Sequence, residues 1–368
     1  MAPNDTRNKT APTPAKASAA DRAHTIGIPL WSGTYMVGSI ECNMRVLVIG
    51  ASGYIGSRAI PVLLSASHEV IAAVRTPAKL DRFWWRERVC VRPLDVLDQQ
   101  SITSAITSDI EAIVYLVHGM AGDNFRETDR RAAASILQAA DNASVARIVY
   151  VSGIVPVVPE SRLSEHLTSR LEVEKILSQI RGSAITLRAA MIIGAGSTSY
   201  AIMSQLARRL PVTVLPDWMN HRVEPLAVTD LTDAIAGAVT VTAKNSRHYD
   251  VGGGTQIAYP ELIAKYLSIN NLERPSVRVP LLPQSLVAEA AARIADVPDP
   301  TVRALIESLQ DDMVTSDQSW IGDLVSPTHT PISIDEALQR VESPIDYIRA
   351  PSQRDPLQTL PGDPRWAR

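Results

Sequence analysis

Three glycines spaced three residues apart place the strongest constraint on how this chain folds. Gly50, Gly53 and Gly56 follow the short apolar run Arg45–Ile49 and precede a helix-forming stretch over residues 54–65. In such a turn the first glycine permits a tight bend, the second lets a ligand approach the backbone, and the third lets the helix pack against the strand. The spacing therefore predicts a strand–turn–helix unit whose helix begins next to an anionic group.

Strand-like and helix-like segments continue to alternate as far as about residue 190. The strand-like segments are short apolar runs, which are typical of strands buried on both faces of a parallel sheet. The predicted strands are 68–74, 88–92, 112–117, 146–151, 184–188 and 248–251, and the predicted helices are 101–108, 124–142 and 164–180. The pattern predicts an α/β fold, a doubly wound parallel sheet (Rossmann) that binds a dinucleotide at the glycine turn.

Beyond residue 190 the alternation stops, and helical stretches are separated by proline-rich turns. We expect residues 44–190 to form the NAD(P)-binding Rossmann domain, with its final strand near 247–252. Residues 191–345 should form a smaller, mostly helical C-terminal substrate lobe. Such a lobe would cover the carboxyl ends of the strands, the edge at which open parallel sheets bind ligands.

The two ends of the chain differ from the rest in composition. Residues 1–43 are predicted to be a disordered or weakly ordered extension, because their first half repeats Ala, Pro, Thr and Lys. Translation could also begin at Met36 or Met44 instead of Met1. Residues 346–368 are rich in proline and charge, and we expect them to form a loose C-terminal tail.

Composition excludes several classes of partner. The net charge of −3 gives no electrostatic reason to expect a nucleic acid or an anionic membrane. Cys42 and Cys90 do not have the spacing of a metal site. No apolar stretch is long enough to span a bilayer, and the first residues lack the apolar core of a secretory signal. We therefore expect a cytoplasmic protein that binds a small-molecule substrate and no metal. Helices on both sides of the sheet are compatible with a homodimer.

The residue that follows the second predicted strand bears on the choice of cofactor. An acidic side chain there would bind the ribose 2′-hydroxyl of NAD, whereas an arginine suits the 2′-phosphate of NADP. This chain has Arg75, followed by Thr76. The interpretation we favour is NADP, with NAD still compatible. The alternative is a solvated surface arginine.

Several motifs resemble a known superfamily. The glycine spacing, Asp95-Val96 after the third strand, and Val149-Tyr-Val-Ser152 at the fifth are similar to those of the short-chain dehydrogenase/reductases. Within that superfamily the chain resembles the atypical and extended NAD(P)H-binding members, similar to nucleoside-diphosphate-sugar epimerases and NmrA-like proteins. The stretches 115–120, 188–194 and 307–314 resemble a poorly characterised atypical subgroup. The resemblance covers roughly residues 44–345.

The resemblance implies a set of cofactor contacts. Asp95 and Val96 would contact the adenine, and Leu116, Val117 and His118 would line the cofactor channel. A structural, hydrogen-bonded role for His118 is the alternative. With the turn and the arginine, the expected cofactor-binding residues are Gly50, Ser52, Gly53, Tyr54, Ile55, Gly56, Arg75, Asp95, Val96, Leu116, Val117 and His118.

The chain departs from the superfamily at its catalytic motif. Where Tyr-x-x-x-Lys should fall, this chain has His166-Leu-Thr-Ser-Arg170, with Glu174 one turn further along the same helix face. His166 could serve as the proton donor, since an ordinary histidine titrates near neutral pH. Arg170 could hold the nicotinamide ribose, and Ser152 could bind the substrate. The alternative is that His166 and Arg170 form a plain polar helix face and that Ser152 only turns the chain.

Three further residues have open interpretations. His221 and Arg222 precede a segment that resembles the entry to a substrate-lobe helix in the extended enzymes. Arg222 could meet an anionic substrate group or form a surface ion pair. Asp230 is interpreted as a residue in the first turn of a helix.

The leading functional interpretation is an NADP-dependent oxidoreductase acting on a small carbonyl, enone or sugar-like substrate. The alternative is a regulator or assembly subunit that binds NAD(P)H without turnover, which the missing Tyr-x-x-x-Lys favours. A sugar-nucleotide epimerase would need an acid/base tyrosine that the sequence does not clearly offer.

Overall fold

Seven strands form one sheet in which every neighbouring pair is parallel. The computed structural model describes Met1 and residues 43–119 and 124–367. The strand order is β11-β6-β5-β4-β1-β2-β3. The strands are β1 Arg45–Ile49, β2 Glu69–Val74, β3 Cys90–Pro93, β4 Ala112–Tyr115, β5 Arg147–Gly153, β6 Ser183–Ala189 and β11 Arg247–Val251. The chain leaves β1 for β2 on one side and later returns to β4 on the other, so a topological switch point lies between β1 and β4. The predicted doubly wound α/β fold is confirmed.

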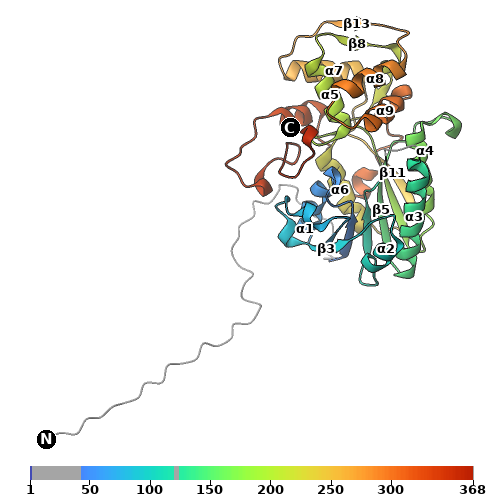
Figure 1. Ribbon diagram of the computed structural model, residues 1–368, viewed down its shortest axis with the longest axis vertical. Coiled ribbons are helices and arrows are strands. Elements are labelled where there is room, and N and C mark those ends of the chain that lie inside the picture. The colour runs from blue at the N-terminus through green and yellow to red at the C-terminus, as the bar shows by residue number, and fades with distance from the viewer. Residues whose placement is uncertain (2–42, 120–123, 368) are drawn as a thin grey trace. The chain divides into compact units, whose positions relative to one another are not determined.

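Helices cover both faces of the sheet (Figure 1). The helices α1 (Tyr54–Ser65) and α6 (Val228–Thr240) pack on one face. The helices α2 (Gln99–Ala105), α3 (Phe125–Asn142) and α4 (Glu165–Leu177) pack on the other. Successive residues of each strand contribute to opposite faces, which gives the sheet two separate apolar cores.

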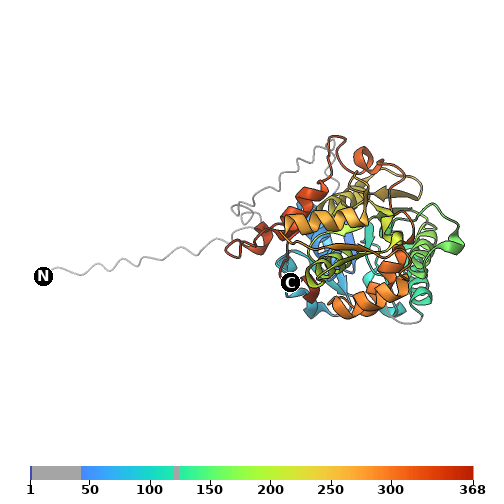
Figure 2. The ribbon, with the colours of Figure 1, turned by 90° about the horizontal axis from the view of Figure 1, so that it is seen from above.

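A second group of helices lies beyond one end of the sheet, above it in Figure 1 and in front of it in Figure 2. The chain enters this lobe from the carboxyl end of β6. The lobe helices are α5 Thr198–Arg209, α7 Tyr259–Ile269, α8 Gln284–Ile294, α9 Asp299–Glu307 and α11 Ile334–Glu342. The short strands are β7 Ile192–Ile193, β8 Thr213–Leu215, β9 Arg222–Val223, β10 Leu226–Ala227, β12 Ile257–Ala258 and β13 Ser276–Arg278, and a short helix, α10, spans Trp320–Asp323.

The segment expected to form the lobe, 191–345, does not lie wholly in it. The helix α6 falls within that range, yet Leu231, Ala234 and Ile235 are fully buried in the core that α1 shares with the sheet. Trp320 is buried in the same core. The chain therefore returns from the lobe to the sheet twice more, once for α6 and β11 and once for α10.

The C-terminal residues are packed, which corrects the expectation of a loose tail over 346–368. Leu357 is fully buried. Asp363 forms an ion pair with Arg58 of α1 at 2.6 Å, and both side chains are almost completely buried. Asp363, one of the charged residues that suggested a solvated tail, is thus neutralised by an arginine far away in the sequence. The stretch around Tyr347 and Ile348 remains exposed.

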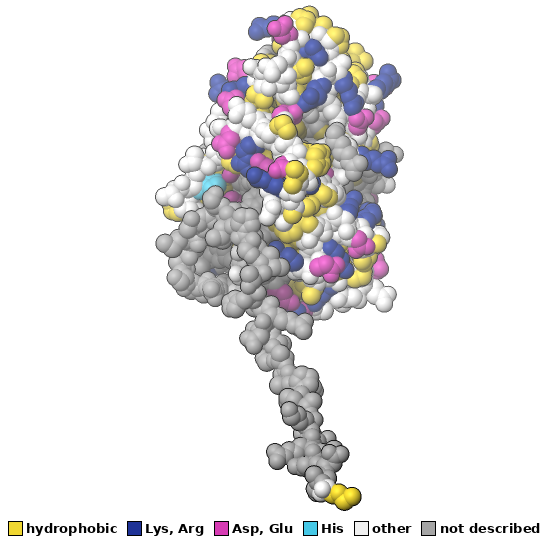
Figure 3. All heavy atoms as spheres, turned by 90° about the vertical axis from the view of Figure 1, so that its left-hand side faces the viewer, with side chains coloured by type: hydrophobic (Ala, Val, Ile, Leu, Met, Phe, Trp, Pro, Cys, Tyr) yellow, Lys and Arg dark blue, Asp and Glu magenta, His cyan; other side chains and the backbone are white. Residues whose placement is uncertain are grey.

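The predicted N-terminal extension, 1–43, lies outside the described residues except for Met1 and Asn43. Among the helices that the structure describes, none is both long and apolar enough to cross a membrane. On the face shown in Figure 3, Lys and Arg side chains are interspersed with Asp and Glu.

Candidate cofactor and active site

The glycine turn at the end of β1 has the geometry that its spacing predicts. Gly50 has a φ of +93°, which L side chains rarely adopt, and it lies against Leu116 and Val117 at the end of β4. A Cβ atom on Gly56 would lie 2.5 Å from the Gly50 carbonyl oxygen and 2.9 Å from the Cα of Ala51. Gly50 and Gly56 are therefore needed for the turn itself.

Gly53 differs from the other two glycines. Its φ of −78° and ψ of 170° are open to any residue, and a Cβ there would meet only the Gly50 carbonyl oxygen at 3.2 Å. The protein backbone thus gives little reason for glycine at this position. A ligand that approaches the backbone here would give that reason, which is the role expected of the second glycine.

The amino end of α1 fits a phosphate group. Within the described residues, no side chain caps this end of α1, and its first turn holds no acidic residue. The first N–H groups of a helix lack intrahelical partners, and the helix dipole favours an anion beside them. The residues present therefore fit the pyrophosphate of a dinucleotide.

Two arginines lie near the adenosine end of this groove. Arg75 follows β2 directly, is exposed, and forms no hydrogen bond or ion pair within the described residues. Arg82 donates a hydrogen bond to the Ser52 carbonyl oxygen at 3.1 Å, so it holds the glycine turn from outside. Asp95 lies beyond the end of β3, where its carboxylate accepts the Leu97 N–H at 3.0 Å.

The three predicted catalytic residues lie together with His118 at the carboxyl ends of β4 and β5. Ser152 is in the last part of β5 and is buried, and His166, in the first turn of α4, is only 8% exposed. Arg170 donates to the Val151 carbonyl oxygen at 3.1 Å. The rings of His118 and His166 meet edge to face, with their centroids 6.4 Å apart. The structure brings these four side chains together, with Ser152 and His166 buried and His118 and Arg170 half-buried, and they are called the β4–β5 cluster below.

The β4–β5 cluster has polar atoms without partners. Four buried side-chain atoms, three in the cluster and one on the adjacent Tyr150, form no hydrogen bond of ordinary length within the described residues: His118 Nδ1, Tyr150 Oη, Ser152 Oγ and Arg170 Nε. Burial raises the pKa of Tyr150, and the nearby Arg170 and Ser152 offset part of that rise. A buried polar atom without a partner is costly, so such atoms seldom gather unless a ligand or water pairs with them. The cluster therefore fits the polar groups of a bound nicotinamide riboside and substrate.

Burial and Arg170 set the protonation state of the two histidines. Burial, with the neighbouring Arg170 charge, lowers the pKa of His166 to about 3. Burial, Arg170 and His166 together hold the pKa of His118 well below its usual value. Both rings are therefore neutral at neutral pH. This lowered pKa does not fit a role for His166 as an imidazolium proton donor near neutral pH, and the part that His166 plays in a reaction stays a prediction.

The sequence interpretation missed Asp129 of α3. Its carboxylate accepts the Gly119 N–H at 2.7 Å and the Ser169 hydroxyl at 3.1 Å, and burial raises its pKa. Asp129 thus connects the loop after His118 to the helix that carries His166. A signal was available: Asp129 lies in the i, i+3, i+4, i+7 stripe that otherwise holds Ala132, Ala133 and Ile136.

Glu174 separates from the other two residues of its predicted helix face. It forms a bidentate ion pair with Arg188 of β6, at 2.7 and 2.9 Å. His166 is buried against the sheet, so the interpretation of a plain solvated polar face is excluded for it.

The remaining candidates lie away from the β4–β5 cluster or have structural partners. The His221 Nδ1 lies 3.2 Å from Asp312, and the exposed Arg222 follows it in β9. Asp230 lies in the first turn of α6, as predicted, and accepts the Ile332 N–H at 3.0 Å. In the described part of the chain, no group of three or more His, Cys, Asp or Glu side chains could hold a metal ion.

A pocket of about 540 Å³ opens beside the amino end of α4, between the Rossmann domain and the lobe. Its lining is largely polar and includes Arg162, Ser164, Gln284, Ser285, Glu307, Ser308, Gln310 and Asp311. Arg162 is paired with Asp311 across the pocket at 3.2 Å. Ser164 and Leu167 of the lining flank the buried His166 in sequence, although none of the four side chains of the β4–β5 cluster lines the pocket itself.

The family model described as NAD(P)H-binding matches residues 50–181. This range begins at the glycine turn and ends after α4, so it includes both the turn and the β4–β5 cluster. No curated protein matches the chain at a significant level.

Solved structures share the fold over most of the chain. A nucleoside-diphosphate-sugar epimerase from Staphylococcus aureus is 15% identical, with 80% of this chain and 100% of that chain covered and a TM-score of 0.65. An NADPH-dependent quinone oxidoreductase from Escherichia coli is 17% identical, with 81% and 100% covered and a TM-score of 0.64. UDP-glucose 4-epimerase from Bifidobacterium longum, solved with NAD⁺ and UDP, is 16% identical, with 80% and 96% covered and a TM-score of 0.59. At this level of identity, the likeness concerns the fold.

Proposed function

We propose that this chain, whose residues 50–181 match a family model described as NAD(P)H-binding, is an NADP(H)-dependent oxidoreductase of the atypical, epimerase-like short-chain dehydrogenase/reductase kind. Its substrate would be a small carbonyl, enone or sugar-like compound. One observation carries the proposal. Unpartnered buried polar atoms gather in the β4–β5 cluster, on the same sheet edge as a glycine turn whose helix is open to a phosphate.

The preference for NADP(H) rests on Arg75. Its exposed guanidinium follows β2 and is not engaged by any described residue. A guanidinium can bind a phosphate through two hydrogen bonds. NAD remains compatible with the glycine turn, because the turn would contact only the pyrophosphate, which NAD and NADP share.

The β4–β5 cluster offers hydrogen-bond donors for a reduction. A bound nicotinamide cofactor would supply the hydride. Ser152 Oγ and a neutral His166 N–H would donate to the substrate carbonyl oxygen and stabilise the negative charge that develops there, and water would supply the proton that completes the alcohol. A neutral imidazole can act in this way when its environment keeps it from protonating. Arg170 would donate to the nicotinamide ribose. It stays charged, so it orients without relaying a proton.

The pocket beside α4 argues for an uncharged substrate. Its lining holds one cation, Arg162, which is already paired with Asp311, together with a second carboxylate, Glu307. A nucleoside diphosphate would meet net negative charge there. Amide and hydroxyl groups on Gln284, Ser285, Ser308 and Gln310 instead suit a neutral polar compound. The UDP bound by the epimerase from Bifidobacterium longum is therefore a poor guide to this pocket.

A non-catalytic NAD(P)H-binding regulator is the second candidate. The observation that favours it is the low pKa of His166, since neither a Tyr-x-x-x-Lys pair nor an imidazolium is available to give a proton. Such a protein would bind the cofactor and signal its presence.

A homodimer and a cytoplasmic location also stay predictions. Light scattering would test the first, and cell fractionation would test the second.

A cofactor-oxidation assay tests the proposal. The purified protein would be titrated with NADPH and NADH by calorimetry, and then assayed with quinones, enones, aldehydes and keto-sugars. We expect tighter NADPH binding and turnover of at least one uncharged carbonyl compound. Tight binding with no turnover across the panel would favour the regulator, and no binding of either cofactor would contradict both candidates.

A further inference from the structure

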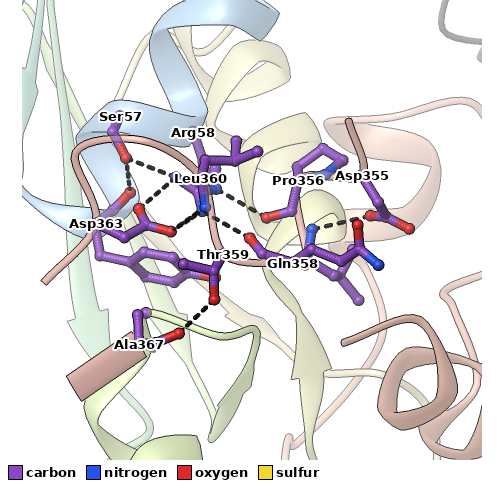
Figure 4. A network of polar contacts seen from close by, with 12 residues as sticks. Ser57, Arg58, Asp355, Pro356, Gln358, Thr359, Leu360, Asp363 and Ala367 are labelled. Carbon is purple, nitrogen blue, oxygen red and sulfur yellow. Dashed lines mark hydrogen bonds and ion pairs between the residues drawn. The ribbon is translucent and has the colours of Figure 1, made fainter. Parts of the chain in front are cut away.

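The C-terminal segment, defined here as residues 351–367, is bonded to the helix that follows the glycine turn (Figure 4). The Arg58 guanidinium makes two hydrogen bonds to the Asp363 carboxylate, at 2.8 and 2.6 Å. It also donates to the carbonyl oxygens of Pro356 and Gln358, at 2.8 and 3.1 Å. The buried Arg58 side chain of α1 thus binds three residues of the segment, Pro356, Gln358 and Asp363.

A chain of contacts runs from Arg58 to the glycine turn. The Arg58 guanidinium lies 4.8 Å from the centre of the Tyr54 ring, and Tyr54 follows Gly53 directly. The Tyr54 ring also lies against Gly194 and Gly196, in the loop between β7 and α5. A Cβ atom on either glycine would overlap with the tyrosine. The first residue of α1 is therefore held between this loop and an arginine that the C-terminal segment fixes.

A second chain of contacts reaches the turn from the adenosine side. Gly362 has a φ of +96° and fits against Phe83, where a Cβ atom would lie 2.5 Å from the ring. Arg82 lies over the same ring, 4.9 Å from its centre, and donates to the Ser52 carbonyl oxygen. The segment thus reaches Gly53 through the side chains of Arg58 and Tyr54, and it reaches Ser52 through those of Phe83 and Arg82.

The segment also bonds directly to the loop between β7 and α5. The Leu357 carbonyl oxygen accepts the Ala195 N–H at 2.8 Å. The Trp366 indole donates to the Gly196 carbonyl oxygen at 3.2 Å. The segment therefore bonds both to α1 and to the 194–196 loop that packs on Tyr54.

We propose that the C-terminal segment holds the glycine turn in its dinucleotide-binding geometry, with Arg58 and Asp363 as positioning residues. The proposal rests on the proposed cofactor binding. It predicts a reciprocal effect: if an anchored segment favours cofactor binding, a bound cofactor must favour the anchored segment by the same factor. A segment that only added stability to the fold would show no such coupling.

The first test is NADPH affinity in the variant Asp363→Ala, measured by calorimetry. We expect about tenfold weaker binding, since freeing Arg58 loosens Tyr54 and the turn. Glu172→Ala is the matched control, because Glu172 forms a bidentate pair with Arg126 on α3 and α4, away from the segment. The control should bind NADPH as the unchanged protein does.

The second test avoids the loss of a buried partner. Trp366→Phe removes the indole donor to Gly196, together with part of the ring that packs beside Ala201 and Ile202, and we expect it to weaken NADPH binding several-fold. In the unchanged protein, hydrogen–deuterium exchange read by mass spectrometry should show NADPH slowing exchange over residues 357–367. This measurement holds even if Asp363→Ala does not fold.

The outcomes separate this inference from the proposed function. If the unchanged protein binds neither NADPH nor NADH, the proposed function fails first. If it binds NADPH, the inference is overturned by unchanged exchange over 357–367, or by folded variants that bind NADPH as tightly as the unchanged protein. Weaker binding in both variants, with slower exchange in the unchanged protein, supports it.

Discussion

The glycine turn and the β4–β5 cluster lie on the same edge of one sheet, yet the turn is formed by backbone groups and the cluster by side chains. The turn is made by backbone: a positive φ at Gly50, close packing at Gly56 and free N–H groups at the start of α1. The β4–β5 cluster is made by buried and half-buried side chains whose charge and hydrogen bonding depend on one another. The first site offers a phosphate its backbone geometry and free N–H groups, with no help from side chains. The chemistry of the second site depends on which side chains surround each histidine, serine and arginine.

The largest expected effect concerns the β4–β5 cluster. His166→Phe should lower turnover by about 10²- to 10³-fold, the usual cost of losing a donor to a developing oxyanion. NADPH affinity should stay within a few-fold, because the phosphates bind at the turn. Steady-state assays at saturating NADPH would measure this, with the half-exposed His248→Phe as control. A full rate in His166→Phe would remove the ring from the reaction.

The pH dependence of turnover tests the protonation state of the same ring. Because the pKa of His166 lies at about 3, turnover should show no limb near the ordinary histidine pKa of about 6.5. A limb there that disappears in His166→Phe would show that the ring does titrate near neutral pH, contrary to its burial beside Arg170.

The glycine turn should respond to a change of shape. Gly53→Val should weaken NADPH binding by about 100-fold or more, close to 2.7 kcal/mol. The backbone at Gly53 accepts a side chain, so the midpoint of thermal unfolding should hardly move. Gly56→Val is the contrasting variant: its Cβ would overlap with the Gly50 carbonyl, so stability should fall as well. Calorimetric titration and thermal unfolding together separate the two. Unchanged affinity in folded Gly53→Val would contradict the assignment of the turn.

A smaller effect is expected at Arg75. A hydrogen bond to a charged phosphate contributes about 1.5–3 kcal/mol, so Arg75→Ala should weaken NADPH binding roughly tenfold or more. NADH binding should be nearly unchanged, since NADH has no 2′-phosphate. Arg88→Ala, at another exposed position of the connection between β2 and β3, serves as control. Equal losses for the two cofactors would show that Arg75 does not contact the phosphate.

The smallest effect concerns stability against pH. His166 is protonated in the unfolded chain below its ordinary pKa of about 6.5, but in the folded chain only near 3. Protonation of this group therefore favours unfolding as the pH falls below about 6.5. At about pH 6 the free energy of unfolding should have lost about 1 kcal/mol through this ring. Urea titrations at several pH values would show a shallower loss in His166→Phe. An identical slope would mean that the folded ring titrates normally.

The difference between the two sites also explains how much the sequence could predict. Strand and helix positions follow local periodicity, so β1 and α1 lie where the sequence places them. The glycine turn is local too, and its three positions suffice to predict its geometry. The gathering of Ser152, His166 and Arg170 was expected only through a resemblance. The low pKa of His166 could not be predicted, because it depends on burial and on an arginine one helical turn away.

Long-range packing accounts for the rest that the sequence could not predict. Asp363 is 305 positions from Arg58, and nothing local indicates that they meet. The proline-rich composition of 351–367 fits a loose tail as well as it fits a packed segment without long helices. The position of the helix α6 in the sequence similarly suggests that it belongs to the lobe. Only its burial against the sheet assigns it to the Rossmann domain.

A structure of the NADPH complex would test the central claim most directly, because one molecule must join the two sites. We predict that the pyrophosphate lies at Gly53 and the amino end of α1, and that the 2′-phosphate meets Arg75. The nicotinamide should lie beside Ser152, His118 and His166, with Arg170 within hydrogen-bonding distance of its ribose. A nicotinamide ring bound away from the β4–β5 cluster would contradict the account, as would a pyrophosphate bound anywhere but the glycine turn.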